Sequence, residues 1–433
     1  MKVKTRSTRK KMPLLQDPSL SGLLIARKNV ITRSAAGTAS GLCEVWLNFA
    51  QKPFLLIQFS DRLQYGIPNA NSDLVNDINL IFDGTIKPTK CEIYGQRIGS
   101  DGSVTTQLWP KRGIFFGNDG EFQKAEVLLA NFGDYHFNGG SVCFEDEIFQ
   151  WQLAPLSEDE RERFEPCETQ DFHVTHSALL RRRDRKSIQI GEAEEQVENL
   201  RLFLSYCQGG WVSPICVQGF SKDNIQIFEH WHDSLLSNYQ SNSRSWLDSF
   251  DGMSIADAWP GFISLCRDPL WKESIKLSFY WFLRGDSGQV GSDGGLILLQ
   301  AAFERLAWHL FVIDDKKLSA AKFKKTQASE KLRMLLARMN IPHDVPNTSP
   351  KLVEFSQDNG GIDGPEILTR LRNKLVHPQR SSYSKKAPYP QAYFLARHYL
   401  VLCLLNLFNY KGNYIVWTKL PRWIGEVARV PWA

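Results

Sequence analysis

The feature of this sequence that most constrains its fold is a change of pattern near residue 260. From Gly41 to Phe149, short runs of β-branched and aromatic residues are interrupted by Gly, Asn and Asp, which is typical of strands separated by turns. After Gly261, apolar residues recur at helical spacing and continue to do so. We therefore predict an α+β protein in which a β-rich, sandwich-like N-terminal region precedes an all-α helical bundle.

The N-terminal part contains a series of runs that predict strands. They are rich in Val, Ile and Phe, and turn-forming residues bound them. One helix interrupts the series, where Val197, Leu200 and Leu204 recur at helical spacing. The expected strands are 43–49, 54–59, 78–82, 91–98, 113–116, 124–130, 164–176, 210–217 and 225–230, and the expected helix is 192–206.

The C-terminal part predicts a compact bundle of five helices. Pro365 suits the first turn of one of them because its φ is already helical, and Glu366 complements the helix dipole there. The expected helices are 269–283, 296–313, 323–339, one from Pro365 to about His377, and 389–410.

Length and texture together predict four segments. A chain of 433 residues exceeds the roughly 250 to 300 residues that one core usually serves. The predicted segments are a basic, flexible N-terminal arm at 1–40, a β-rich domain at 41–186, a second α/β lobe and linker at 187–260, and the helical bundle at 261–433.

Composition indicates a soluble, cytoplasmic protein. The net charge of +5 owes much to the Lys and Arg residues of the first twelve positions, which form either a solvated terminus or a phosphate-attracting arm. Eight cysteines without a C-x-x-C pair predict reduced thiols. The apolar segment 393–410 carries Arg397 and His398, which favours a core helix over a membrane span.

An arginine and a histidine separated by four residues stand near the end of a predicted helix. They are Arg372 and His377, and a polar residue follows the arginine while two apolar residues precede the histidine. This pattern, in the penultimate helix of a C-terminal bundle, resembles the Rx4-6H signature of HEPN domains. Together with the segment from Gly294 to Glu304, it looks most like the HEPN group of ApeA-type anti-phage defence proteins.

The resemblance implies a metal-independent endoribonuclease that cleaves RNA, with tRNA as a candidate, and that uses no cofactor. It also implies a homodimer with facing motifs, or a higher homo-oligomer, formed through the bundle, together with a phage-derived trigger and a role in abortive infection or as a toxin. Many HEPN toxins carry a tyrosine two residues after the histidine, a site of regulatory adenylylation. Here that position is Gln379, so we do not expect such regulation.

The chemistry suits these residue types. The ribose 2′-OH would attack phosphorus, so a proton must leave that hydroxyl and another must reach the departing 5′-oxygen. Histidine as a residue type can exchange protons near neutral pH, so His377 would serve as general acid or base. Arg372 would clamp the phosphate in a bidentate fork, and Asn373 would act as an orienting hydrogen-bond donor.

Helix geometry adds a constraint. Five residue steps on a regular helix leave Arg372 and His377 about 140° apart, so they cannot share one face. Asn373 and His377, four residues apart, do line up. Pro378 disfavours helical angles at His377, so we expect the helix to end there and the imidazole to turn outward.

Other residues would support the site. Glu304 lies in an apolar helix, where a buried carboxylate needs a partner, and we expect that partner to be Arg372. A purely structural ion pair is the alternative for Glu304. The basic residues that flank the motif would hold RNA phosphates without reading bases; they are Lys374, Arg380, Lys385 and Lys386.

Competing interpretations remain open. The histidine pairs at 173 and 176 and at 230 and 232 lack the ligand spacing of a recognised metal site, so we interpret them as surface or core residues and predict no metal. The basic run at 181–186 could bind phosphates but is more typical of a solvated linker. The alternative for the whole protein is a catalytically inactive HEPN scaffold or a nucleotide- or RNA-sensing module.

Overall fold

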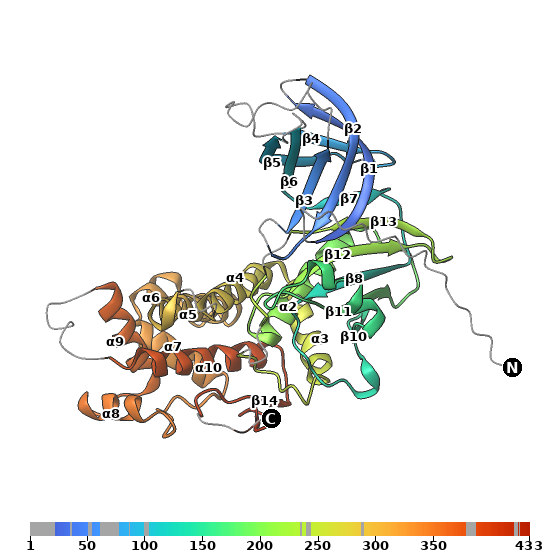
Figure 1. Ribbon diagram of the computed structural model, residues 1–433. Coiled ribbons are helices and arrows are strands. Elements are labelled where there is room, and N and C mark those ends of the chain that lie inside the picture. The colour runs from blue at the N-terminus through green and yellow to red at the C-terminus, as the bar shows by residue number, and fades with distance from the viewer. Residues whose placement is uncertain are drawn as a thin grey trace.

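The computed structural model describes residues 22–34, 37–50, 54–60, 78–85, 87–98, 104–233, 236–239, 244–286, 290–377, 387–419, 423 and 425–433. Strands dominate the first half of the chain and helices the second (Figure 1). This confirms the α+β class with a β-rich N-terminal region followed by a helical C-terminal region.

Six of the described strands form a closed barrel: β1 (Leu23–Ser34), β2 (Gly37–Leu47), β3 (Leu55–Ser60), β4 (Ile78–Phe82), β5 (Thr89–Ile98) and β6 (Val104–Pro110). Their order is β1, β2, β3, β6, β5, β4, and β1 closes the barrel because it pairs with both β2 and β4. Closure removes the free edges that a sandwich would leave. The prediction of a sandwich is therefore wrong for this part of the chain.

The barrel also corrects the predicted N-terminal arm. β1 and the first residues of β2 lie inside 1–40, so this range is not a flexible arm throughout. Residues 1–21, which contain the basic cluster, lie outside the described residues. The barrel interior includes Val45, Ile57 and Leu80, each 0% exposed, and this buried apolar surface explains why the segment is ordered.

A second sheet of seven strands follows the barrel. Its strands are β7 (Ile114–Gly117), β8 (Lys124–Ala130), β9 (Val142–Glu145), β10 (Phe149–Pro155), β11 (Val174–Arg182), β12 (Ser213–Phe220) and β13 (Gln226–Trp231). The central strand β8 pairs with β11 on one side and with β12 on the other. The predicted border at residue 186 therefore runs through one continuous sheet, because backbone pairing joins strands from both sides of it.

The strand predicted at 164–176 starts only at Val174. A short helix α1 (Glu158–Glu162) and a 3₁₀ turn at Glu165–Cys167 occupy the preceding residues. Ser157 and Glu160 form a capping box that starts α1, and Pro166 has no N–H to donate to a ladder. The 3₁₀ turn that follows the capped helix α1 thus takes the place of the first part of the expected strand.

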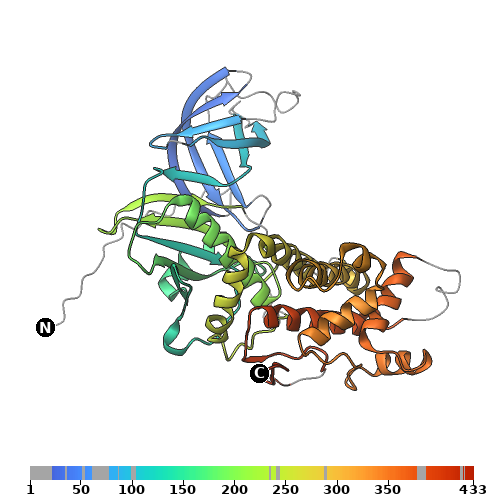
Figure 2. The ribbon, with the colours of Figure 1, turned by 180° about the vertical axis from the view of Figure 1, so that it is seen from behind.

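Helix α2 (Ile190–Gln208) packs across one face of the seven-stranded sheet (Figure 2). Its buried residues join a core that continues into the helical region through α3 (Ser254–Arg267) and α4 (Pro269–Asp286). Two rings show the junction directly, because Tyr206 of α2 stacks on Phe279 of α4 with centroids 4.8 Å apart. The sheet and the helices therefore share one hydrophobic core.

The remaining described helices are α5 (Gly291–Trp308), continued by a π-helical turn at His309–Asp314, α6 (Ala320–Lys325), α7 (Ala328–Arg338), α8 (Pro350–Asp358), α9 (Gly364–Val376) and α10 (Tyr389–Leu407). The helix predicted at 323–339 is two helices, because Thr326 and Gln327 adopt extended backbone angles. α8 was not predicted. α3 begins at Ser254, before the predicted start of the bundle at 261.

Helix α5 is central to the bundle and packs against α4, α7, α9 and α10. Gly291–Asp314 is the one described stretch whose length and hydropathy would suffice to cross a membrane, and 56% of its apolar window is buried inside the molecule. α10 is largely buried, with Leu395, Leu400 and Leu404 each 0% exposed. The prediction of a core helix at 393–410 is confirmed.

Candidate functional site

The helix that carries the Arg/His motif, α9, begins as predicted. The Asp363 side chain accepts a hydrogen bond from the Glu366 N–H at 3.0 Å, and Pro365 lies in the first turn. Arg333 of α7 binds the same Asp363 carboxylate with Nε and Nη2, at 2.7 and 3.1 Å. The buried side of the helix carries Leu368 and Leu371, each 0% exposed. The start of α9 is thus fixed by capping, an ion pair and apolar burial together.

The helix also ends where expected. Val376 is the last helical residue, and His377 has φ −124° and ψ 70°. The His377 N–H still donates to the Asn373 carbonyl at 2.8 Å, and its side chain is exposed. The predicted break at His377 is confirmed. Pro378, to which we attributed the break, lies outside the described residues.

Arg372 lies five residues before His377 on α9 and is half-buried. Its Nη1 donates to the Asn373 Oδ1 atom at 3.1 Å. Its Nε is buried and has no hydrogen-bond partner among the described residues. Asn373 therefore accepts through its side-chain oxygen and holds the guanidinium, while the predicted role of its amide as a donor stays a prediction. No described contact joins the Arg372 and His377 side chains.

Glu304 differs from its predicted role. Its side chain is 43% exposed, so it is not the buried carboxylate we expected. Its described ion pair is with Lys331 of α7, at 4.0 Å between Nζ and Oε2, and not with Arg372. Lys331 is 11% exposed and its ammonium lies 4.5 Å from the centroid of the Phe323 ring, which holds the cation beside α5. This ion pair joins α5 to α7 and leaves the α9 motif without Glu304.

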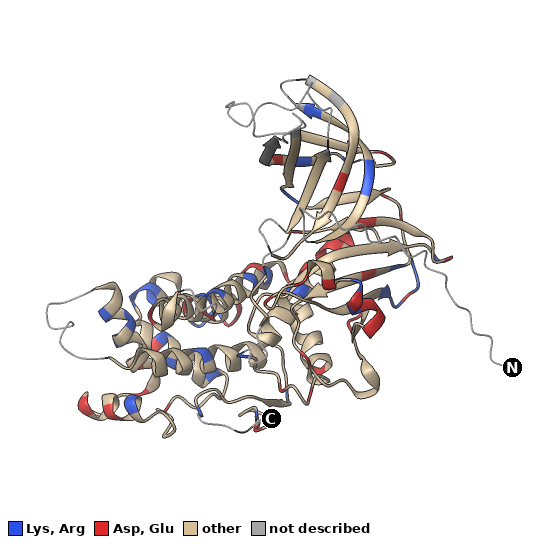
Figure 3. Cartoon of the chain, viewed as in Figure 1, with Lys and Arg blue, Asp and Glu red and all other residues tan. Residues whose placement is uncertain are grey.

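Of the predicted phosphate-binding residues, the structure describes only Lys374. It is exposed, and its Nζ lies 5.2 Å from the centroid of the Phe355 ring of α8. Arg380, Lys385 and Lys386 lie outside the described residues. The sequence interpretation missed three exposed lysines on α6, which lies at the same end of the bundle as α9 (Figure 3); they are Lys322, Lys324 and Lys325. The K-x-K-K spacing was a usable signal.

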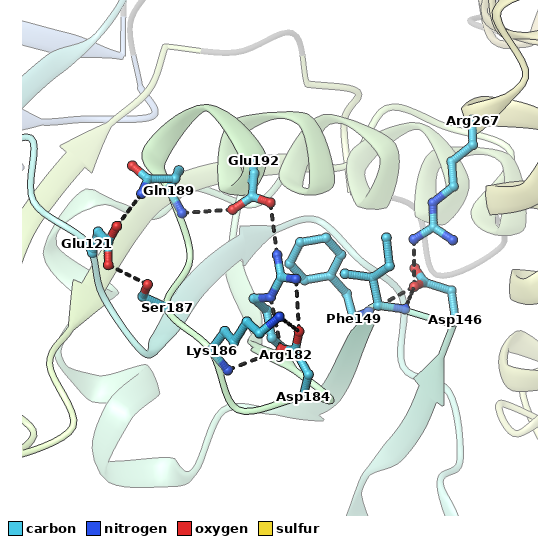
Figure 4. Close-up of polar contacts among 11 residues, drawn as sticks. Glu121, Asp146, Phe149, Arg182, Asp184, Lys186, Ser187, Gln189, Glu192 and Arg267 are labelled. Carbon is cyan, nitrogen blue, oxygen red and sulfur yellow. Dashed lines mark hydrogen bonds and ion pairs between the residues drawn. The ribbon is translucent and has the colours of Figure 1, made fainter.

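The basic run at 181–186 has a structural role. Arg182 binds Asp184 through Nε and Nη2, at 3.0 and 3.1 Å, and Glu192 through Nη1 at 2.9 Å (Figure 4). The hydrogen bond from Arg182 keeps the pKa of the Asp184 carboxyl well below its usual range. Lys186 also lies 3.6 Å from Asp184. The two carboxylates compensate the charge of Arg182 and fasten β11 to the start of α2, while Arg181, Arg185 and Lys186 are exposed.

The structure places both histidine pairs. No group of three or more His, Cys, Asp or Glu side chains suitable for a metal occurs among the residues that the structure covers. His173 lies 3.1 Å from Glu168, while His176 is buried in the sheet core with 1% of its surface exposed. His230 and His232 lie on the same face of β13 and its extension, with ring centroids 3.9 Å apart.

A serine, a histidine and an aspartate also meet inside the bundle. Ser274 Oγ lies 3.0 Å from His309 Nδ1, and His309 Nε2 lies 3.6 Å from Asp314 Oδ1. Ser274 is 0% exposed, and the Arg305 Nε–H occupies its oxygen at 2.9 Å. A nucleophile must reach its substrate, so this group is a buried polar network and not a hydrolase site.

Comparison with known proteins places similarity in two blocks. Residues 123–242 match the YopA central domain family, and residues 268–429 match the YopA C-terminal domain family. The first block covers most of the seven-stranded sheet with α2, and the second covers the helices from α4 onward. The six barrel strands precede both matches.

One curated relative is the SPbeta prophage-derived uncharacterized protein YopA of Bacillus subtilis (strain 168). It is 28% identical over 263 residues, which cover 60% of this chain and 58% of the relative. The chain thus spans less than two thirds of that relative's length. No solved structure matches. In its sheet and its helical region, the chain is similar to YopA-type domains.

Proposed function

We propose that this chain is a HEPN-type, metal-independent endoribonuclease of an anti-phage or toxin-like defence system that cleaves RNA by 2′-OH transesterification. The observation that carries the proposal is the end of α9. His377 is exposed at a helix break, directly after a helix whose Arg372 has a buried Nε without a described partner. An accessible imidazole and an incompletely bonded guanidinium at the end of one helix are groups that can take part in phosphodiester cleavage.

His377 would act on protons. The ribose 2′-oxygen forms a bond to phosphorus as its proton leaves, and the bond from phosphorus to the 5′-oxygen breaks as that oxygen gains a proton. The products are a 2′,3′-cyclic phosphate and a free 5′-hydroxyl. Arg372, held by Asn373 at 3.1 Å, would stabilise the charge that collects on the phosphoryl oxygens.

A homodimer would supply the second imidazole that a single α9 lacks. The two steps need a base and an acid, and each α9 presents one His377. Two copies with facing motifs would place both imidazoles at one phosphate. The exposed lysines of α6, together with Lys374, would attract the RNA backbone to this end of the bundle.

The prophage origin of the relative fits a protein that acts in conflict between phages and their hosts. In such a system the barrel and the seven-stranded sheet would respond to a phage-derived trigger, and the helical region would cut RNA. Transfer RNA is the first substrate to test.

The second candidate function is a catalytically inactive HEPN scaffold or RNA-sensing module. One observation favours it: the described hydrogen bonds of Arg372 and His377 stay within α9. Glu304 belongs to a separate ion pair with Lys331. In this alternative the motif shapes the end of a helix and cuts nothing.

Expression of the wild type and of His377→Ala distinguishes the two functions. The wild type should arrest growth and fragment RNA, and His377→Ala and Arg372→Ala should each lower cleavage at least about 100-fold, since each removes a catalytic group. His136→Ala is the matched control, because His136 is also exposed but lies in the sheet unit. Addition of EDTA to purified protein should leave cleavage unchanged.

The melting temperature completes the experiment. His377 is exposed, so its replacement by Ala should change the free energy of unfolding by no more than about 0.5 kcal/mol. A wild type that cuts no RNA under any trigger tested, or His377→Ala that cuts as well as the wild type, would exclude the endoribonuclease. Loss of cleavage with EDTA would exclude the metal-independent mechanism.

A further inference from the structure

A cavity of about 100 Å³ lies between α2 and the strands β12 and β13. One face of α2 supplies Ile190, Ala193 and Val197, and the strands supply Val217 and Phe228. Pro214, two histidines and three charged residues complete the lining. A mostly apolar cavity with a few convergent polar groups is the usual form of a small-molecule site.

Two histidines line this cavity. Alternation along β13 puts Phe228, His230 and His232 on one face, and the His rings lie 3.9 Å apart between centroids. His232 Nε2 is buried without a hydrogen-bond partner among the described residues. Burial lowers the pKa of His230 to about 4 and that of His232 to about 3, so both imidazoles are uncharged near neutral pH. An uncharged imidazole with a free nitrogen can accept or donate one hydrogen bond.

The charges at the mouth limit the kind of ligand. Arg201 is bound by Glu198, with Nε and Nη2 at 2.8 and 2.9 Å from the carboxylate oxygens, and its guanidinium lies 4.9 Å from the centroid of the Trp211 ring. The remaining carboxylate, Glu194, lies 3.9 Å from His230 Nδ1 and its side chain is 56% exposed. The three charged residues sum to −1, which disfavours phosphates and carboxylates.

The volume limits the size. An apolar cavity of about 150 Å³ holds benzene. The cavity here is smaller, so a single ring is the largest group that it could take, and the exposed Glu194 lies in its lining. We propose that it binds an uncharged, planar, single-ring heterocycle of the pyrimidine-base type, which exchanges a hydrogen bond with His232 and donates one to Glu194. This site is separate from the α9 motif and does not depend on the proposed ribonuclease activity.

The site is connected to the helical region through α2. Lys272 of α4 lies 2.5 Å from Glu195, the neighbour of Glu194. At the other end of α2, the Tyr206 hydroxyl donates to the Val401 carbonyl of α10 at 3.1 Å. A ligand that shifts α2 would therefore also act on α4 and α10, the two helices of the bundle that these contacts join to it.

Calorimetric titration of the full chain with cytosine and with uracil tests the proposal. One of these bases should bind with saturation at about one per chain, with a Kd of about 1 mM or tighter. His232→Phe keeps the ring but removes the hydrogen-bonding nitrogens, and Val217→Phe fills the cavity. Each should weaken binding at least about tenfold, while His136→Ala, an exposed histidine outside the cavity, should not.

A second arm keeps the proposal testable if either core variant fails to fold. Cytidine 5′-monophosphate should bind the wild type at least about tenfold more weakly than cytosine, because of Glu194. The exposed Glu194→Gln should reduce that difference. The proposal is overturned if neither base binds the wild type, if the base binds the cavity variants as well as the wild type, or if zinc sulfate binds at one per chain and His232→Phe abolishes it.

Discussion

His377 and His176 are the same residue type in opposite surroundings. His377 follows the last residue of α9 and is exposed, so it can meet a substrate. His176 lies in β11 with 1% of its surface exposed, and its ring packs against Phe132 and Phe137 at centroid distances of 5.0 and 6.1 Å. Its Nδ1 has no hydrogen-bond partner in the described part of the chain. His176 is therefore a core residue whose titration bears on stability and not on function.

Burial of His176 predicts acid sensitivity. Desolvation lowers its pKa from 6.5 to about 3 in the folded protein. Between these values the unfolded chain binds the additional proton, so the stabilisation present above about pH 6.5 is lost as the pH falls toward 3. One such histidine changes the free energy of unfolding by up to about 1.4 kcal/mol per pH unit. His176→Phe should therefore have a shallower pH dependence, measured by urea unfolding at about pH 7, 6 and 5.

The matched control for this prediction is His136→Ala, since His136 is exposed. It should keep the dependence of the wild type. His230, His232 and His398 also have lowered pKa values, so His176→Phe should keep part of the slope. An unchanged slope in His176→Phe would contradict the assignment.

Among the elements, α9 is held most firmly at its N-terminal end. Asp363 caps the first turn and receives both Nε and Nη2 of Arg333, while the opposite end stops at an exposed His377. The Tyr399 hydroxyl of α10 bonds the His343 carbonyl at 3.1 Å, and the Gly364 N–H donates to the same oxygen at 3.0 Å. The motif thus lies at the less constrained end of a well-anchored helix.

Replacement of Asp363 separates the two contributions to that anchor. Asp363→Ala removes both the cap and the ion pair, and it should lower the free energy of unfolding by about 2 to 3 kcal/mol. Asp363→Asn keeps an oxygen for the Glu366 N–H but loses the charge that pairs with Arg333. This variant should lower the free energy of unfolding by about 1 kcal/mol. Chemical denaturation measures both, and equal losses in the two variants would show that the cap contributes nothing.

At the scale of the whole molecule, one buried ion pair joins the parts. Asp286 at the end of α4 accepts from Arg397 Nε at 3.0 Å and from the Tyr393 hydroxyl at 2.6 Å, both on α10. Arg244, from the segment that follows the sheet, adds a third contact at 2.8 Å. The Asp286 and Arg397 side chains are each 1% exposed. The loss of either Asp286 or Arg397 would leave the other charge unpaired in the core.

Asp286→Asn should therefore destabilise the protein strongly. It leaves the buried Arg397 guanidinium without a counter-charge, which costs about 3 to 5 kcal/mol. Glu195→Gln is the matched control, because the Glu195–Lys272 pair is 52% and 37% exposed and should contribute no more than about 1 kcal/mol. Thermal unfolding measures the difference, and similar melting temperatures for the two variants would contradict it.

The prediction from sequence succeeded where near neighbours decide the outcome. The strands Ile78–Phe82 and Lys124–Ala130 have the predicted bounds, because alternation and turn residues lie within a few positions of them. The start of α9 around Pro365 and its break at His377 follow from helix-start and helix-ending signals in the same stretch. The split at Thr326 was missed, because the apolar period continues across it.

The candidate site also has features that the sequence predicted and features that it did not. The exposure of His377 follows from local chain geometry and was predicted. The partner of Glu304 was not, because Lys331 lies on another helix and nothing near Glu304 in the sequence marks it. The cavity beside His230 and His232 was also not predicted, since its other wall is α2, more than twenty residues earlier in the chain.

The sequence by itself determined the succession of β-rich and helical regions, the ends of α9 and the exposure of the motif histidine. Each depends on the propensities and hydrogen bonds of residues a few positions apart. Only the tertiary structure decided that the first strands close into a barrel, that one sheet crosses residue 186, and that Glu304 pairs with Lys331. These outcomes depend on which distant segments bury one another's surface and exchange backbone hydrogen bonds, a choice among many pairings that no local pattern encodes.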